Sequence, residues 1–410
     1  MSKKFKLVFL GIFALALLGC VKKIWQVDYD FAENNYTNHS LQYVTDDSVY
    51  LVGRTSISET AGPYSVFVSR FDLNGNFVWE TIVPDAVSDF GRFASGSVLA
   101  EDADNNVYLA WSNLNSGLNT LHKINAQGIV ENSQRLGEGV YVDDIKLADN
   151  GSLYYTVYGG FYFYAYTTDG EFLWSDMPTD AEGSSQSTVT LIENNRILVS
   201  TNHGLVVYSD AGERLASLNK ETVPVDRFSL AQVMNGRIWV SVVASGQARL
   251  LALDLSLDVL DEVELGAVAG DVRLATDNGR ICLVTGADYT GELAQGSDAI
   301  VIHQITESGT LLSQTAVGAG NYPQWYSAKT IGAGKDGCYF GENYGDSTAE
   351  DVKSSISLVK ADGTITDTVV FDDAILVDFD VLGSDVIRSD TVGEYDGSYT
   401  GISIARHNRY

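Results

Sequence analysis

A short turn sequence that recurs along the chain constrains its fold more than any other feature. Each copy places a glycine between polar residues and an apolar run, as in Asp72-Leu-Asn-Gly-Asn-Phe-Val-Trp79 and Thr167-Thr-Asp-Gly-Glu-Phe-Leu-Trp174. The glycines stand at positions 75, 128, 170, 212, 309 and 363, and a degenerate copy has Leu257 in the glycine position. Successive copies are 42 to 54 residues apart, a period that suits a repeated unit of four short β-strands.

The segments between the turns have the pattern of strands. Asn106–Trp111, Gly151–Val157 and Arg237–Val242 are rich in apolar, β-branched and aromatic residues, and Gly, Asn and Asp bound them. No long stretch keeps a helical period of apolar residues. We therefore expect an almost entirely β-structured protein.

The two ends of the chain complement each other. Ile24–Tyr29 resembles the strand that follows each turn, with Trp25 placed as Trp79 and Trp174 are, and residues 375–406 contain three strand-like runs without a fourth. We predict an eight-bladed β-propeller of four-stranded antiparallel blades, whose last blade is closed by the N-terminal strand. Such a closure removes exposed sheet edges. A ring of seven blades is the alternative.

The first blade also resembles a known repeat. Ser48–Ser56 followed by Tyr64–Trp79 resembles the bacterial propeller repeat written SBBP, and the tryptophan after the glycine turn is similar to blades of quinoprotein and outer-membrane assembly propellers. The resemblance implies architecture, because these families share blades and not one activity. Quinoprotein dehydrogenases usually carry adjacent cysteines, whereas Cys282 and Cys338 are far apart in this sequence.

The N-terminus has the pattern of an export signal. Residues 1–19 contain a basic start and then an uncharged apolar run, Leu7–Leu18. That run is too short to cross a bilayer, which takes roughly 20 helical residues. Leu17-Leu-Gly-Cys20 resembles the lipobox of bacterial lipoproteins, which implies that the Cys20 thiol receives diacylglycerol with acyl chains such as palmitate. An ordinary secretory signal with a chance cysteine is the alternative.

These patterns predict three segments and a cellular location. We expect a signal peptide at 1–19, a lipidated anchor at 20–23 and a single propeller domain at 24–410. Position 21 is Val and not Asp, which in enteric bacteria favours sorting to the outer membrane. The protein is then an outer-membrane lipoprotein that faces the periplasm or the cell surface.

The charge of the chain excludes one class of partner. The formal net charge is −28, and it becomes −31 when Lys3, Lys4 and Lys6 leave with the signal peptide. So negative a surface repels nucleic acid. After Cys20 only Cys282 and Cys338 remain, and either one disulfide or two buried thiols fits an oxidising compartment.

The connections between second and third strands indicate a candidate binding surface. In a propeller they emerge on one face, the top, and here they are short in blades three to five. They are long in four consecutive blades, at residues 287–297, 342–354, 390–399 and 55–64. We predict a raised arc, suited to recognition because tyrosines lie among polar groups, unless the loops are merely tolerated insertions. The arc consists of Asp288, Tyr289, Glu292, Tyr344, Asp346, Glu350, Asp351, Glu394, Tyr395, Asp396 and Tyr399.

The short tether of the anchor has a geometric consequence. Cys20 stands only four residues before the predicted closing strand, which starts on the bottom face. We therefore expect the bottom face, or its edge, to lie near the membrane and the arc to point away.

One segment partly matches a calcium loop. Asp102, Asp104 and Asn106 offer oxygen ligands at alternate positions, but Val107 stands where the sharp-turn glycine belongs and position twelve is not Glu. Calcium is the one cofactor for which the sequence offers a candidate site. His122 and His303 stand at equivalent repeat positions, which predicts packing between blades.

The sequence therefore favours a non-enzymatic role. We expect a monomeric lipoprotein, held to a membrane by its lipid, that binds a protein or glycan partner through the top face, and we assign no catalytic residue. One alternative is an enzyme that degrades carbohydrate or another polymer through carboxylates of the same loops. A cation-binding module is another. No nucleophile, zinc or phosphate-loop motif was found.

Overall fold

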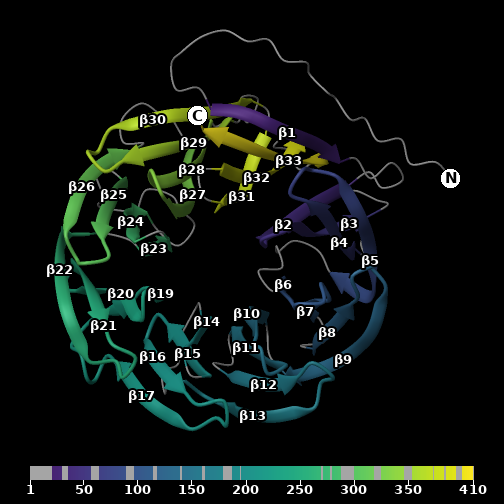
Figure 1. The fold of residues 1–410 in the computed structure, drawn as a ribbon, viewed down its shortest axis with the longest axis horizontal. Helices are drawn as coiled ribbons and strands as arrows, with labels where there is room; N and C mark the ends of the chain where they lie inside the picture. The colour runs from purple at the N-terminus through teal and green to yellow at the C-terminus, as the bar shows by residue number, and fades with distance from the viewer. Residues whose placement is uncertain are drawn as a thin grey trace.

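The computed structural model is a ring of β-sheets. It describes residues 21–29, 36–56, 64–88, 97–113, 118–138, 141–158, 162–178, 187–193, 195–268, 271–277, 279–287, 300–317, 325–345, 353–372, 374–382, 385–393 and 399–409. These residues form 33 strands in eight sheets, without a helix. Figure 1 shows the sheets as blades around a common axis, each with its first strand near the axis and its last at the rim. The predicted eight-bladed propeller is confirmed.

The first four blades follow one another along the chain. Blade one consists of β2 (Tyr36–Val44), β3 (Ser48–Ser56), β4 (Tyr64–Asp72) and β5 (Phe77–Ser88). Blade two consists of β6 (Ser97–Glu101), β7 (Val107–Asn113), β8 (Leu118–Ile124) and β9 (Val130–Glu138). Blade three consists of β10 (Tyr141–Leu147), β11 (Ser152–Tyr158), β12 (Phe163–Thr167) and β13 (Phe172–Asp176). Blade four consists of β14 (Ser187–Ile192), β15 (Arg196–Thr201), β16 (Gly204–Tyr208) and β17 (Arg214–Asn219).

The last four blades continue this order. Blade five has a divided inner strand, β18 (Arg227–Phe228) and β19 (Gln232–Met234), then β20 (Arg237–Ala244), β21 (Gln247–Leu253) and β22 (Val259–Ala267). Blade six consists of β23 (Asp271–Asp277), β24 (Arg280–Ala287), β25 (Ile300–Thr306) and β26 (Leu311–Val317). Blade seven consists of β27 (Trp325–Gly334), β28 (Gly337–Gly345), β29 (Lys353–Lys360) and β30 (Ile365–Asp372). Blade eight contains β31 (Ala374–Leu382), β32 (Asp385–Gly393) and β33 (Tyr399–Arg409).

The N-terminal strand closes the ring. β1 (Val21–Tyr29) pairs antiparallel with β33, for example Val27 opposite Ile404, and becomes the outer strand of blade eight. Figure 1 shows the purple β1 beside the yellow β33. The predicted closure is confirmed, and the seven-bladed alternative is wrong.

All seven predicted turn positions share one backbone conformation. Their φ angles lie between 65° and 86°, and the residue at each position donates its N–H to the carbonyl three residues earlier. Glycine adopts this left-handed conformation without steric cost. Leu257 adopts it as well, with φ 65°, so the degenerate seventh copy is a true turn.

The turns also fasten neighbouring blades to each other. Trp25, Trp79 and Trp174 lie on outer strands, and each indole Nε1 donates to a backbone carbonyl in the turn of the next blade at 2.9 to 3.0 Å. A Cβ atom on Gly75 would lie only 2.6 Å from the ring of Trp25. Glycine is therefore required at this turn by the close approach of the indole as well as by φ.

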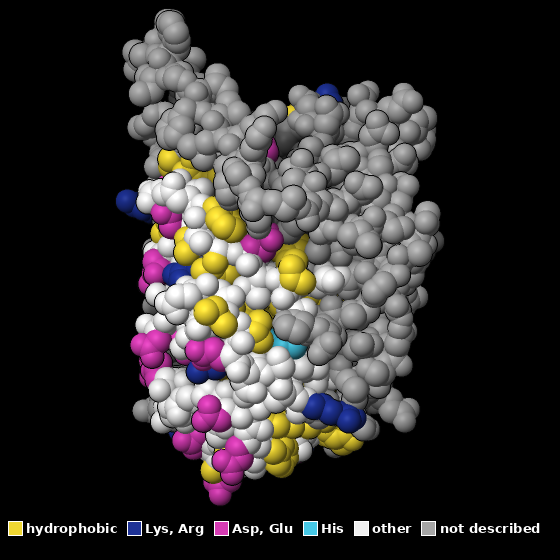
Figure 2. Space-filling model, turned by 90° about the vertical axis from the view of Figure 1, so that its right-hand side faces the viewer, with side chains coloured by type: hydrophobic (Ala, Val, Ile, Leu, Met, Phe, Trp, Pro, Cys, Tyr) yellow, Lys and Arg dark blue, Asp and Glu magenta, His cyan; other side chains and the backbone are white. Residues whose placement is uncertain are grey.

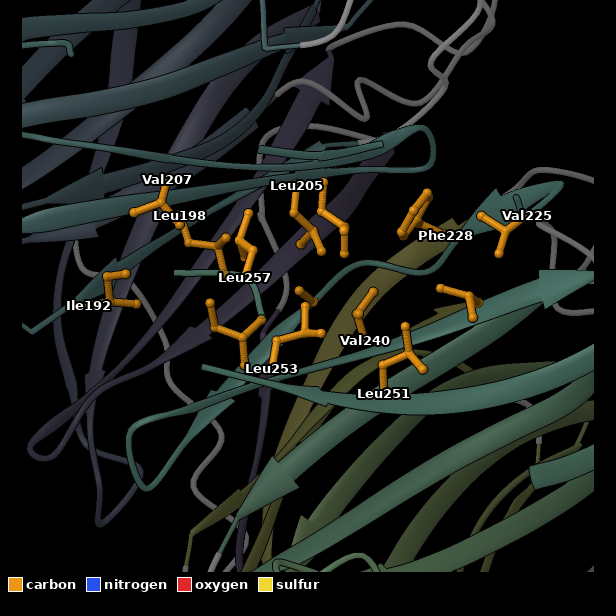
Figure 3. Close-up of a cluster of buried hydrophobic side chains, with 14 residues drawn as sticks. Ile192, Leu198, Leu205, Val207, Val225, Phe228, Val240, Leu251, Leu253 and Leu257 are labelled. Carbon is orange, nitrogen blue, oxygen red and sulfur yellow. The ribbon is translucent and has the colours of Figure 1, made fainter. Parts of the chain in front are cut away.

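At the junction of blades four and five the large and small residues are exchanged, because the large side chain is in the turn and the small one is on the outer strand. The outer strand of blade four has Ala216 where blades one, three and eight have tryptophan, and the turn of blade five has Leu257, which is 4 % exposed. Leu257 joins the apolar cluster between these two blades, and Ala216 packs against that cluster (Figure 3). Burying a leucine is worth about 1.5 to 3 kcal/mol, which is comparable with the roughly 1 to 3 kcal/mol that a strained backbone conformation costs.

The core is divided among the junctions of the ring. Eight clusters of buried hydrophobic residues each lie between two neighbouring blades, and together they account for all eight junctions. At the junction of blades six and seven, Cys282 of β24 and Cys338 of β28 form a disulfide, with their Cα atoms 5.6 Å apart. The structure thereby decides between the two states that the sequence left open. Among the described residues, none belongs to a helix long and apolar enough to span a bilayer.

Candidate functional site

The predicted arc falls mainly on residues that the structure does not describe. Tyr344 lies near the end of β28, and Tyr399 begins β33. The other arc residues lie outside the described ranges; they are Asp288, Tyr289, Glu292, Asp346, Glu350, Asp351, Glu394, Tyr395 and Asp396. Cys20 and the signal peptide lie outside them as well.

The strand bounds nevertheless test the lengths of these connections. The chain between second and third strands covers positions 288–299, 346–352, 394–398 and 57–63 in blades six, seven, eight and one. In blades four and five it covers only positions 202–203 and 245–246. In blades two and three it covers positions 114–117 and 159–162. The four connections predicted to be long are therefore the longest and belong to consecutive blades, but that of blade eight is only one position longer than those of blades two and three.

The calcium-like segment is a turn that is organised by its own side chains. Residues 102–106 connect β6 to β7, and Oδ1 of Asp102 accepts the N–H groups of Asp104 at 3.0 Å and Asn106 at 2.8 Å. Oδ1 of Asp72 accepts two backbone N–H groups in the same way in the turn of blade one. This is the common role of Asp in turns. In the described part of the chain, no group of three or more His, Cys, Asp or Glu is placed to hold a metal ion.

The two equivalent histidines are buried on third strands. His122 Nδ1 lies 2.8 Å from Ser133 Oγ, while the His303 ring contacts Thr285 Oγ1 at 2.9 Å and Gln314 Nε2 at 3.2 Å. Each of these hydrogen bonds lies within the histidine's own blade, and the packing between blades that the sequence predicts stays a prediction. Burial lowers the pKa of His303 to about 4, so this ring is neutral at physiological pH.

Inner strands bring together ionisable groups that the sequence analysis did not select. Burial, and then the charges of Glu101, Asp144 and Asp380, raise the pKa of Tyr43. These four residues come from β2, β6, β10 and β31, the inner strands of four blades. The sequence signal that could have identified these groups is the presence of acids, such as Asp144 and Asp380, within otherwise apolar inner strands.

Asp143 lies beside Asp144 on the inner strand β10. It accepts a hydrogen bond from Ser187 Oγ at 2.7 Å, and burial raises its pKa to about 7, with a further rise from the charge of Asp144. Asp144 is held differently, because its carboxylate accepts the N–H of Val189 at 2.9 Å and pairs with Lys146 Nζ at 3.3 Å. A carboxyl that titrates near neutral pH can exchange a proton in that range.

The bottom face, where the turns emerge, is acidic. Six blades have a carboxylate in the turn between third and fourth strands: Asp72, Asp169, Asp210, Asp254, Glu307 and Asp362. Figure 2 views the ring from the side, and there too more acidic side chains than Lys and Arg are seen among the described residues.

Comparisons with known proteins show the fold alone. No protein-family model and no curated protein matches the chain. A catalytically inactive virginiamycin B lyase from Staphylococcus aureus, solved with quinupristin, is similar over 77 % of this chain and 94 % of its own, with a TM-score of 0.50 and 14 % identity. Selenomethionine-substituted virginiamycin B lyase from the same organism is similar over 93 % of this chain and 98 % of its own, with a TM-score of 0.50 and 13 % identity. At such identities these neighbours establish a propeller and say nothing of activity.

Proposed function

We propose that this chain is a lipoprotein of the bacterial envelope whose propeller serves as a binding scaffold. Residues 1–19 direct export, Cys20 carries the lipid, and the protein is sorted to the outer membrane. The observation that carries the proposal is the position of β1, which begins at Val21 and pairs with β33 from Val21 to Tyr29, with one register shift at Ile24. A lipid on Cys20 is then attached to the ring itself, without a linker.

The recognition surface in this proposal is the top face on the side of blades six, seven, eight and one. The second-to-third connections of these blades are all longer than those of blades four and five, which supports recognition on one side of the ring. Loops on a rigid scaffold are the common place for binding residues. Acids and tyrosines in these connections suit a protein or glycan partner.

Lipidation is tested by metabolic labelling with an alkyne analogue of palmitate. The wild-type chain should be labelled and sediment with the outer membrane, and the Cys20→Ser variant should lose both properties. Cys282 and Cys338 are joined to each other, so they do not compete for the label. A wild-type chain that remains unlabelled and soluble would exclude the lipoprotein.

The scaffold role is tested by crosslinking in intact cells followed by mass spectrometry. One variant has the 287–297 and 342–354 connections shortened, and a matched control has Asn202 and His203, the short connection of blade four, replaced by glycines. A crosslinked partner should disappear in the first variant and persist in the control. Near-UV circular dichroism must first show that both variants fold. A partner that survives loop shortening would contradict the proposed surface.

An enzyme acting through carboxylates is the second candidate, and Asp143 is the observation that favours it. Its pKa of about 7 suits general acid or base catalysis at neutral pH. A screen of envelope polysaccharides with the wild-type chain and the Asp143→Asn variant decides the question. Hydrolysis that the substitution abolishes, in a variant that still folds, would favour the enzyme, and no turnover by the wild-type chain would dismiss it.

A further inference from the structure

The outer strands expose a row of aliphatic side chains at one level of the rim. The third residue after the turn position is a large aliphatic residue in five blades, and Ile24 of β1 stands at the equivalent position beside Trp25. The six are Ile24 (45 % exposed), Val78 (47 %), Leu173 (41 %), Leu215 (48 %), Leu260 (52 %) and Leu312 (40 %). Because this row follows most of the ring, its apolar character does not by itself distinguish one blade from another.

Charge distinguishes blade eight from the others. Strands β1 and β33 together contain four Lys or Arg and one acid, Asp28, in a chain with 54 acidic and 26 basic residues. Arg406 is paired with Asp385 of the same blade, which leaves Lys22, Lys23 and Arg409 as the excess positive charge. The pairing of Val21 with Arg409, and of Lys23 with His407, brings these two segments to the same corner of the ring. Lys23 is exposed there, three residues after Cys20.

Other parts of the surface have the opposite charge. The outer strand of blade five, β22, carries Asp261, Glu262 and Glu264 and no Lys or Arg. The bottom face carries a carboxylate in six of its turns, as described above. Anionic headgroups repel such surfaces, while each Lys or Arg near an anionic leaflet is worth about 1 kcal/mol. An approach of the bottom face to a membrane is therefore opposed, and an approach of the blade-eight rim is favoured.

The flanks of blade eight add exposed apolar side chains to this edge, on strands that also carry acids: Asp367 and Asp372 on β30, and Glu80 and Asp85 on β5. On β30 of blade seven, Ile365 is 44 % exposed and Val370 is 49 % exposed. On β5 of blade one, Val78 and Ile82 are 47 % and 46 % exposed. Figure 1 shows β30 and β5 on either side of β1 along the rim.

We propose that this edge of the ring, with Lys23 and Ile24 at its centre, rests on an anionic lipid surface, so that the propeller stands on its rim. The inference rests on the proposed lipidation of Cys20, which lies one residue before β1 and so within about 4 Å of the ring's own backbone. A single acyl signal anchors weakly, and basic and apolar side chains beside it supply the second signal that stable binding needs. The same orientation keeps the acidic turns clear of the headgroups.

The test places an environment-sensitive fluorophore at matched positions on the full lipidated chain. Ile24→Cys labels the proposed edge, and Leu215→Cys labels the same repeat position of blade four, across the ring, where exposure is nearly equal. The chain is reconstituted in vesicles of phosphatidylethanolamine and phosphatidylglycerol. The label at position 24 should shift to the blue and be quenched by lipid-borne quenchers, and the label at position 215 should remain in water. Equal spectra at both positions would overturn the proposal.

A charge reversal tests the electrostatic part. Lys22→Glu with Lys23→Glu should reduce quenching at position 24 in the phosphatidylglycerol vesicles, and should change nothing in vesicles of phosphatidylcholine alone. Unchanged quenching in the anionic vesicles would remove the role of these lysines. A bottom-face label, Asp254→Cys, that enters the bilayer more deeply than the label at 24 would show a face-down orientation.

Mass spectrometry of the same samples shows whether Cys20 carries lipid, independently of how the ring is oriented. A chain without lipid on Cys20 refutes the proposed function. A lipidated chain whose label at position 24 stays in water refutes only the edge-on orientation.

Discussion

Two junctions of the same ring are built from different interactions. The junction of blades four and five contains a cluster of 14 buried hydrophobic residues (Figure 3). Among the residues whose burial the structure describes, the cluster between blades seven and eight contains six. Buried polar side chains face the same junction from β28, β29 and β32: Asn343, Ser354, Arg388 and Asp390.

The polar junction uses bonds with a required direction. Asn343 Nδ2 of β28 donates to the carbonyl of Leu376 in β31 at 3.0 Å, and its Oδ1 accepts the N–H of the same residue at 2.9 Å. The amide of Asn343 thus pairs with the neighbouring blade as a backbone strand would. Apolar packing tolerates small shifts, whereas such a pair forms in one register only.

A buried ion pair completes the contrast. Arg388 and Asp390 form an ion pair in β32 with side chains 5 % and 0 % exposed. They lie on the same side of that strand as Val386, which belongs to the cluster between blades seven and eight. The junction of blades seven and eight is thus aligned by specific polar contacts, whereas the junction of blades four and five is held by apolar packing.

The largest expected effect comes from breaking this ion pair. Arg388→Met should lower the free energy of unfolding by about 3 to 5 kcal/mol, because it leaves the Asp390 carboxylate buried without its partner. Guanidinium unfolding followed by tryptophan fluorescence measures the change. The double variant Arg388→Met with Asp390→Leu should recover most of the loss. A single variant as stable as the wild type would show that the pair contributes nothing to the junction.

Creating a cavity in the apolar junction should have the next largest effect. Leu253 is fully buried in the cluster between blades four and five, and Leu253→Ala should cost about 3 kcal/mol through lost burial and an unfilled space. The matched control is Leu215→Ala, 48 % exposed on the outer strand β17 of blade four, which should change stability by less than about 0.5 kcal/mol. Similar losses in both variants would contradict the assignment of this cluster to the core.

Lowering the pH should destabilise the junction of blades seven and eight, where His407 is buried, and leave the junction of blades four and five unaffected. Burial and the charge of Arg388 lower the pKa of His407 from 6.5 to about 3. Below pH 6.5 the unfolded chain takes up a proton that the folded chain refuses, so stability falls as the pH drops from 6.5 toward 3. For one such histidine the loss between pH 7 and pH 5 is about 2 kcal/mol.

Unfolding experiments across this pH range check the sign. The control is His407→Gln, which keeps a hydrogen-bond acceptor near Arg388 Nε, the group that donates to the His407 ring at 3.1 Å. The variant should lose this part of the slope, while Asp143 and His303 titrate alike in both proteins. An unchanged slope would mean that His407 is protonated in the folded state.

The smallest expected effect is a coupling between Ala216 and Leu257. Ala216→Trp alone should destabilise the chain by about 1 to 3 kcal/mol, because an indole would overlap the Leu257 side chain. The double variant with Leu257→Gly recreates the tryptophan–glycine pair found at three other junctions of the ring. A double-mutant cycle should therefore show a favourable coupling of about 1 kcal/mol. Additive effects would mean that the two positions are independent.

The turns show what could be read from residues alone. Glycine at a fixed offset before an apolar run predicts a left-handed turn wherever it stands, because its cause lies within a few residues of chain. The repeat spacing then predicts Leu257 as a turn residue despite its side chain. The match of Ala216 to Leu257 was not foreseen, because these residues meet only when two blades pack together.

The candidate sites were predicted less completely. The lengths of the second-to-third connections were readable from the strand pattern, and the closing role of β1 followed from counting strands. No pattern within one repeat predicts that Asp143 is buried. Its hydrogen bond with Ser187 also depends on the next blade. The pairing of Cys282 with Cys338 likewise depends on which strands face each other across a junction.

The sequence by itself determined the repeated unit, the number of blades and the way the ring closes, because strand alternation and turn chemistry act over a few residues. Only the tertiary structure decided which side chains share a junction. It brought the basic ends of β1 and β33 to one corner, gathered carboxylates near the axis, and filled one junction with apolar volume and another with ions. Such placements depend on strand register and on the angle between blades, which arise from the closure of the whole ring.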